Sequence, residues 1–120
     1  MKTHLRQRDV RFAIEDGCLV RTVTGDANDG RTYSHRCLQA TFEAIAHAMA
    51  EVPAQGNGTS MMLLAEQEKV PYTQTNVALE FLKERGIVDV RHRRCYPATA
   101  DAYLDAMTEW HALDEEPKAV

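Results

Sequence analysis

The sequence has no apolar run that approaches the roughly 20 residues needed for a helix to cross a membrane. Its first ten residues are charged and contain no apolar stretch of the kind that secretory signal peptides carry. Cysteine is scarce, with three residues, an odd number, and no Cys-x-x-Cys pair, which suits reduced thiols better than a disulfide framework. These absences predict a cytoplasmic protein that makes no membrane contact.

Sequence signatures of catalysis and nucleotide binding are also missing. The Gly-x-Gly of residues 56–58 is not followed by the lysine that a phosphate-binding loop requires. No two carboxylates have a spacing typical of general acid–base catalysis, and no dinucleotide-binding fingerprint is present. We therefore expect no enzymatic activity, no catalytic residues and no cofactor.

Length and charge set the remaining bounds. The 120 residues suffice for one domain with a single core, and 44% hydrophobic with 27% charged residues is ordinary for a globular protein. The net charge of −4 argues against general affinity for nucleic acid. However, six acidic residues and one lysine lie from residue 100 onward, so the acidic excess is at the C-terminus. The negative net charge is therefore compatible with a nucleic-acid-binding face in the part of the chain before residue 100.

Residues 8–24 are predicted to form a β-hairpin. Asp16-Gly17 is a two-residue turn typical of type I′ hairpins. With this turn, five of the six inward side chains are apolar, so one face of the hairpin needs burial. An isolated hairpin is not stable in water, and it must therefore pack on the rest of the chain. The expected pairs on this face are Ile14–Leu19, Phe12–Arg21 and Val10–Val23.

A polar loop and a first helix over residues 33–52 are expected next. Thr32 or Ser34 offers a capping hydroxyl, and Pro53 ends the pattern. The apolar residues between them recur at helical spacing and form one stripe. They are Leu38, Phe42, Ile45, Met49 and Val52.

Residues 59–99 predict two further helices and a second hairpin. A hydroxyl at residues 59–60 caps the helix "MMLLAEQEK", which ends before Pro71. The next helix starts near Thr73 and stops at Gly86. The β-prone runs "IVDV" and "RCYPAT" then surround a tight turn of basic residues.

A final helix over residues 100–113 is followed by an acidic tail, residues 114–120. Tyr103, Met107 and Trp110 share one side of this helix. Such a stripe serves equally well as a dimer interface or as the closing layer of the monomer's own core.

Two helices joined by a short turn and followed by two strands around a basic tip is the element order of winged helix-turn-helix proteins. Residues 59–99, about a third of the chain, resemble this superfamily of transcription regulators, with matches at "LAE", "ALEFL" and "RGIV". The resemblance implies an α+β fold, in which a winged helix-turn-helix core carries an N-terminal β-hairpin and a C-terminal helix. One domain would span residues 1–120. In this superfamily a helix after the wing often mediates dimerisation, so the resemblance also suggests a homodimer.

The function implied by the resemblance is DNA binding, in a transcription regulator that places its second helix in the major groove of double-stranded DNA. Gln and Asn side chains on that helix can read adenine. Arginines of the wing would neutralise backbone phosphates. The expected DNA-binding residues are Tyr72, Thr73, Gln74 and Asn76 on the helix and Arg91, Arg93 and Arg94 on the wing.

The chain departs from the superfamily at several positions. Lys69 stands where many members have a glycine, and a left-handed conformation there costs something like 1 kcal/mol. Val77 and Phe81 share a helix face where polar or basic residues are usual, and Glu80 adds a negative charge beside them. If the hairpin covers Val77 and Phe81, DNA binding is favoured. If they are exposed, a protein partner is favoured, and the alternative function is a non-catalytic protein–protein interaction module.

Two His/Cys pairs offer weaker alternatives. His35 and Cys37 with His92 and Cys95 could supply four zinc ligands, although their spacings match zinc motifs poorly. Cys95 and His92 lack a third group that would orient them for catalysis. Cys95 also lies beside arginines that could lower its pKa and make it sensitive to oxidants. The simpler interpretation is a buried structural thiol beside exposed histidines. We predict no metal site.

Overall fold

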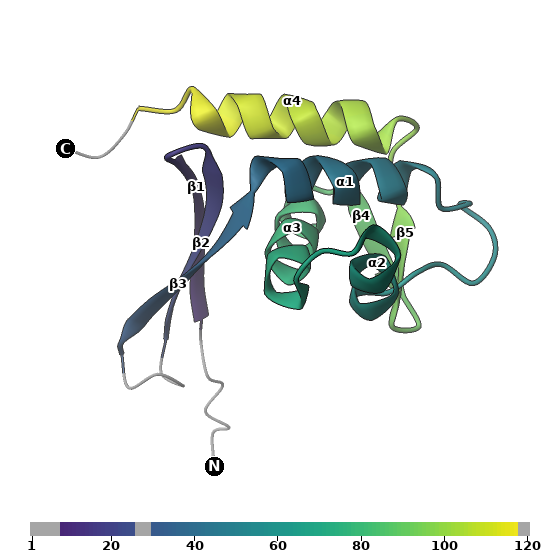
Figure 1. Cartoon of the computed structure of the whole chain (residues 1–120), viewed down its shortest axis with the longest axis horizontal. Helices are drawn as coiled ribbons and strands as arrows, with labels where there is room; N and C mark the ends of the chain where they lie inside the picture. The colour runs from purple at the N-terminus through teal and green to yellow at the C-terminus, as the bar shows by residue number, and fades with distance from the viewer. Residues whose placement is uncertain (1–7, 26–29, 118–120) are drawn as a thin grey trace, which may run out of the picture.

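The computed structural model describes residues 8–25 and 30–117, which form an α+β fold with four helices and two small antiparallel sheets (Figure 1). The ends of the expected single domain, residues 1–7 and 118–120, lie outside the described residues, as do residues 26–29 of the expected polar loop. The strands are β1 (Arg8–Glu15), β2 (Cys18–Gly25), β3 (Thr32–Leu38), β4 (Val88–Arg91) and β5 (Arg94–Pro97), and the helices are α1 (Gln39–Ala50), α2 (Met61–Glu68), α3 (Tyr72–Glu84) and α4 (Ala102–Asp114).

The β1–β2 hairpin has the predicted turn and the predicted register. Asp16 and Gly17 have φ of 51° and 74°, and a type I′ turn requires positive values at both residues. Strand pairing places Ile14 opposite Leu19, and the other two expected pairs are also formed. The turn chemistry and the alternation of apolar residues are both local signals, so this part of the fold could be derived from the sequence.

The expectation of a helix from residue 33 is wrong, because residues 32–38 form the third strand of the sheet. β3 pairs with β2 in antiparallel register, with Cys37 opposite Leu19. Two strands alone are only marginally stable, and β3 completes the sheet along the open edge of β2. Leu38, the first residue of the expected helical stripe, is 52% exposed and precedes α1. The stripe residues Phe42, Ile45 and Met49 are fully buried on α1 as predicted.

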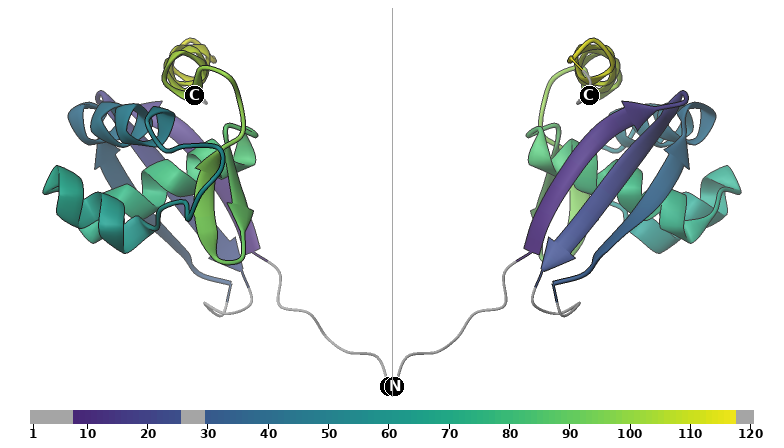
Figure 2. Two further views of the ribbon diagram at one scale, coloured as in Figure 1. Left: turned by 90° about the vertical axis from the view of Figure 1, so that its right-hand side faces the viewer. Right: turned by 90° about the vertical axis from the view of Figure 1, so that its left-hand side faces the viewer.

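α1, α2 and α3 lie on one side of the three-stranded sheet, whose other face looks away from them (Figure 2). α4 runs across α1 and passes the end of the β1–β2 hairpin that carries the turn (Figure 1). None of the helices in the described ranges is long and apolar enough to span a bilayer.

The turn between α2 and α3 keeps a left-handed residue without a glycine. Ser60 caps α2, since its hydroxyl accepts a hydrogen bond from the Leu63 N–H at 3.2 Å. Lys69 ends α2 with φ 57° and ψ 48°, the left-handed conformation that was expected to be costly there. Pro71 then precedes α3, in keeping with the predicted break.

The β4–β5 hairpin turns at His92 and Arg93, as predicted, with φ of 50° and 66°. The segment before α2 forms an isolated antiparallel bridge with this hairpin, because Thr59 and Cys95 exchange backbone hydrogen bonds of 3.0 and 2.8 Å. This pairing ties the hairpin to the start of α2. The described order after the first sheet is therefore α1, an isolated bridge, α2, α3 and a hairpin.

α4 begins two residues later than expected, because the Asp101 side chain caps it by accepting the Leu104 N–H at 3.0 Å. Trp110 is 2% exposed and packs on Phe42 with ring centroids 4.8 Å apart. Tyr103 and Met107 are partly buried against the same core. The stripe thus closes the core of this chain, which is one of the two roles considered for it.

An unbroken series of aromatic contacts runs through the core. Phe81 of α3 contacts Phe12 of β1 at 5.3 Å and Phe42 of α1 at 5.8 Å between centroids. Phe42 in turn contacts Trp110 of α4. The sheet and three helices are therefore joined through Phe81 and Phe42.

Replacing Phe81 with alanine should lower the free energy of unfolding by about 3–5 kcal/mol, because a fully buried ring leaves a cavity shared by several elements. Urea denaturation followed by Trp110 fluorescence measures this change. Leu104→Ala is a matched control on an exposed helix position and should change stability by no more than about 0.5 kcal/mol. Equal effects of the two substitutions would contradict the packing described.

Candidate nucleic-acid interface

The two faces of α3 have different roles. Tyr72, Thr73 and Asn76, three of the predicted DNA-binding residues, are exposed on its N-terminal half. That half of α3 and the tip of the β4–β5 hairpin point toward the same end of the molecule, opposite α4 (Figure 1). The opposite face of the helix is inside the protein. Its buried residues are Thr75, Val77, Ala78, Leu79, Phe81 and Leu82.

Val77 and Phe81, whose exposure separated the two predicted functions, are both 0% exposed. The hairpin contributes to covering this face, because Phe12 of β1 is in edge-to-face contact with Phe81. α1 also contributes, through the contact between Phe42 and Phe81. A protein partner therefore has no access to Val77 and Phe81 in this structure.

Gln74, the fourth helix residue of the predicted set, is half-buried and makes a structural contact. Its side-chain oxygen accepts a hydrogen bond from the backbone N–H of Leu38 at 3.1 Å. Leu38 is the residue where β3 ends and α1 begins, and it has no side chain able to cap the helix. Gln74 thus holds α3 to the junction of β3 and α1.

Glu80 is neutralised by a residue that sequence reasoning did not connect with it. The Arg21 guanidinium of β2 donates to the Glu80 carboxylate at 2.7 Å, and its side chain is 6% exposed. A second Arg21 nitrogen lies 3.2 Å from Nδ1 of His35 on β3. The one available signal was that Arg21 is the only charged side chain among the six on the inward face of the hairpin. Burial of that charge demands a partner across the interface.

Two of the three arginines in the β4–β5 hairpin hold a loop. Arg91 stacks on the Tyr96 ring at 3.9 Å and donates to the carbonyl of Ala54 at 3.1 Å. Arg94 donates to the carbonyls of Asn57 and Gly58 at 2.9 and 3.3 Å. These contacts bind residues 53–58 to the hairpin, so Arg91 and Arg94 have a structural role.

Arg93 differs from the other two arginines. It lies in the hairpin turn and is exposed, and no hydrogen bond or ion pair to another described residue engages its side chain. It is therefore the arginine of the β4–β5 hairpin that is best placed to contact an external anion.

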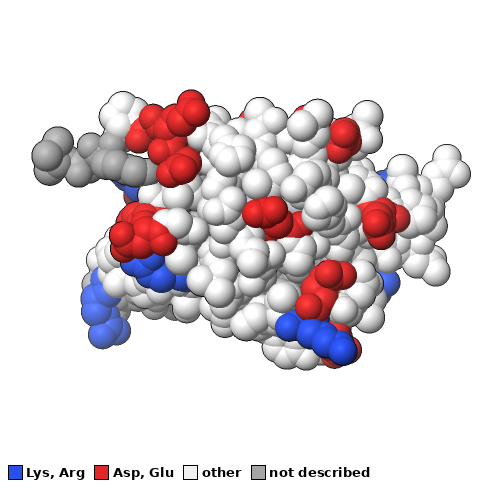
Figure 3. Space-filling model, turned by 45° about the horizontal axis from the view of Figure 1, so that its top comes forward, with Lys and Arg blue, Asp and Glu red and all other residues white. Residues whose placement is uncertain are grey.

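Charge is distributed unevenly over the surface. Carboxylates are spread over the face formed by α4 and α1, with lysines and arginines near its edges (Figure 3). The tip of the β4–β5 hairpin points away from this acidic face (Figure 1). A polyanion would thus be repelled by the face formed by α4 and α1.

The three cysteines are free thiols, and Cys37 and Cys95 are buried. Burial raises the pKa of the Cys37 thiol to about 12. Burial also raises the pKa of Cys95, and the opposing effects of Lys83 and Arg94 are smaller. Arg94 thus acts on the Cys95 thiol in the direction considered from the sequence, but burial outweighs it and the net change in pKa is upward. Within residues 8–25 and 30–117, no three His, Cys, Asp or Glu side chains form a group able to hold a metal ion.

Comparison of the chain with protein-family models, with curated proteins and with solved structures found no match. The case for a function therefore depends on the geometry described above.

Burial should make Cys37 and Cys95 slow to react with Ellman's reagent at about pH 8, since a thiol with a raised pKa stays protonated there. Cys18, which is partly exposed, should react first. Absorbance of the released thiolate counts the fast-reacting thiols in native protein. The same measurement in urea-unfolded protein counts all thiols. Cys18→Ser should remove the fast phase, and rapid reaction of all three thiols in native protein would show that the two sites are open.

Proposed function

We propose that this protein is a small cytoplasmic DNA-binding protein of the winged helix-turn-helix type that regulates transcription. The observation that carries the proposal is the exposure of Tyr72, Thr73 and Asn76 on the half of α3 that lies at the same end as the hairpin tip with Arg93. The element order of α1, the bridge at Thr59, α2, α3 and β4–β5 supports the winged-helix assignment.

The three-stranded sheet helps to offset two features of α3 that are unfavourable for DNA binding, its apolar face and the charge of Glu80. The apolar face of α3 is covered, and the charge of Glu80 is paired with that of Arg21. The surface left on the N-terminal half of α3 is therefore polar. It can approach base edges without leaving an apolar patch in water.

The roles of the exposed residues follow from their chemistry. The amide of Asn76 can make two hydrogen bonds to adenine in the major groove. Thr73 and Tyr72 lie in the first turn of α3, where helix N–H groups favour a phosphate. Arg93 would contact the backbone and fix the orientation of the protein without reading sequence. Gln74, Arg91 and Arg94 would act indirectly, by holding α3 and the hairpin in place.

The alternative function, a protein–protein interaction module, needs a surface other than the Val77/Phe81 face and the side of α4 that carries Trp110. Val77, Phe81 and Trp110 are all inside the protein. The observation that still favours a protein partner is the exposure of Met62 and Leu63 on α2.

Fluorescence anisotropy of a labelled mixed-sequence duplex, at low and at moderate salt, tests the proposal. Binding should weaken steeply with salt, and Arg93→Ala should lower the slope of log affinity against log salt by about one. Arg85→Ala is the control, because this arginine lies at the end of α3 away from the hairpin tip and pairs with Glu109. Absence of binding even at low salt would exclude the proposed function.

Sequence reading is tested on duplexes selected from a randomised pool. Asn76→Ala should cost about 1–3 kcal/mol of binding free energy to the selected site and should relax the preference at one base pair. Gln74→Ala is the matched control on the same helix. We expect it to lower thermal stability while leaving the base preference unchanged. A change in preference with Gln74→Ala and none with Asn76→Ala would contradict the assignment of roles.

A further inference from the structure

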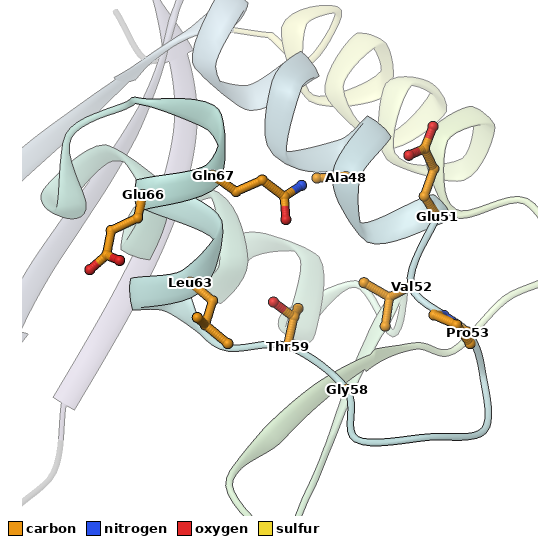
Figure 4. A pocket seen from close by; sticks show the side chains of 9 residues that line it. All are labelled: Ala48, Glu51, Val52, Pro53, Gly58, Thr59, Leu63, Glu66 and Gln67. Atoms are coloured by element: carbon orange, nitrogen blue, oxygen red, sulfur yellow. The ribbon is translucent and has the colours of Figure 1, made fainter.

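A groove of about 680 Å³ lies between the end of α1, the loop after it and α2 (Figure 4). Val52, Pro53 and Leu63 supply its apolar surface. Glu51 and Glu66 lie toward opposite sides of it, and no Lys or Arg is part of its lining. The groove therefore combines an apolar centre with negative charge at two ends.

The loop wall of the groove is held by the β4–β5 hairpin. Besides the contacts of Arg91 and Arg94, the Tyr96 hydroxyl donates to the carbonyl of Gly56 at 3.0 Å. Gly58 fits closely against the hairpin, since a Cβ added there would lie 2.8 Å from the Tyr96 ring and 2.9 Å from a backbone oxygen. A groove with a fixed wall loses little conformational entropy when it is occupied, which favours binding.

Two apolar side chains of α2 near the groove are exposed to solvent. Leu63 is 46% exposed and its neighbour Met62 is 56% exposed, although both precede the buried residues Leu64 and Ala65. Single exposed apolar residues are common on protein surfaces, but Leu63 lines a concave surface that has further apolar groups. An occupant that covers Leu63 would remove this apolar area from water.

We propose that this groove docks a short extended segment of a partner protein in which Lys or Arg residues flank aliphatic side chains. The aliphatic groups would cover Val52, Pro53 and Leu63, and the cationic groups would meet Glu51 and Glu66. The Gln67 side chain, whose nitrogen donates to Glu68 at 2.9 Å, presents its oxygen as an acceptor for a backbone N–H of the segment. The volume is within the range of 300–1,000 Å³ or so that is typical of specific pockets.

This inference does not depend on the proposed DNA binding. The groove is formed by α1, α2 and the loop, whereas the proposed base-reading residues are on α3. The two surfaces share no lining residue, although they adjoin, because the Tyr72 hydroxyl donates to the Glu66 carboxylate at 3.4 Å. Each proposal can therefore fail without the other.

The first experiment is an amide NMR titration of the full chain with an acetylated, amidated pentapeptide of alternating lysine and leucine. Saturable shifts should concentrate at Val52, Gly58, Leu63 and Gln67. Two comparison peptides, in which serine replaces leucine or glutamate replaces lysine, should each bind more weakly. Shifts that follow the acidic face of α4 instead, or equal binding of the glutamate peptide, would overturn the proposal.

Two variants test the charged and apolar parts of the groove separately. Glu51→Gln combined with Glu66→Gln should weaken the lysine–leucine peptide about fivefold, as expected for two exposed ion pairs. Leu63→Ser should weaken it about tenfold through lost apolar contact. The matched control for the charge variant is Asp114→Asn with Glu116→Gln, at the end of α4 and just after it. The matched control for Leu63→Ser is Leu104→Ser on α4. If the control variants weaken binding as much as the groove variants, the segment does not dock in the groove. Duplex binding should be unchanged by Leu63→Ser.

Discussion

The packing of Phe81 between Phe12 and Phe42 is the interaction on which the arrangement of this protein depends. Phe81 is the residue of α3 that meets the sheet on one side and α1 on the other, and α1 carries the contact on to Trp110 of α4. With Phe81 directed inward, the helical period decides which residues of α3 face outward. Tyr72, Thr73 and Asn76 are exposed for this reason. The core thus selects the surface that is available for a ligand.

A polar contact fixes the same interface where the apolar packing ends. Arg21 enters the contact between sheet and helix and must be paired, because an isolated buried charge is strongly unfavourable. Glu80 of α3 and His35 of β3 supply its partners from two elements. Hydrophobic contact is non-directional, whereas these charge-assisted hydrogen bonds have defined geometry. We infer that they restrict how α3 can rotate or slide on the sheet, in addition to pairing the charge of Glu80, which stays partly exposed.

How much could be predicted depended on whether a feature was local in the sequence. The turn at Asp16-Gly17, a hydroxyl cap of α2 at residue 59 or 60 and the basic turn of the second hairpin depend on neighbouring residues, and the sequence predicted all three. β3 was missed because residues 32–38 become a strand by pairing with the open edge of β2. The roles of Gln74, Arg91 and Arg94 were also missed. Their acceptors or donors lie 36 or 37 residues away in the chain, and no local pattern indicates such contacts.

The second hairpin illustrates how one group of like charges can serve two purposes. Arg91, Arg93 and Arg94 are nearly contiguous, and the sequence alone predicts that all three bind phosphate. In the structure, Arg91 and Arg94 bind loop carbonyls and so shape the wall of the α1–α2 groove, whereas Arg93 projects from the turn. Removing all three would disturb the loop as well as any contact with DNA, and the two effects would be confounded. A substitution of Arg93 alone separates them, because the loop contacts of Arg91 and Arg94 stay intact.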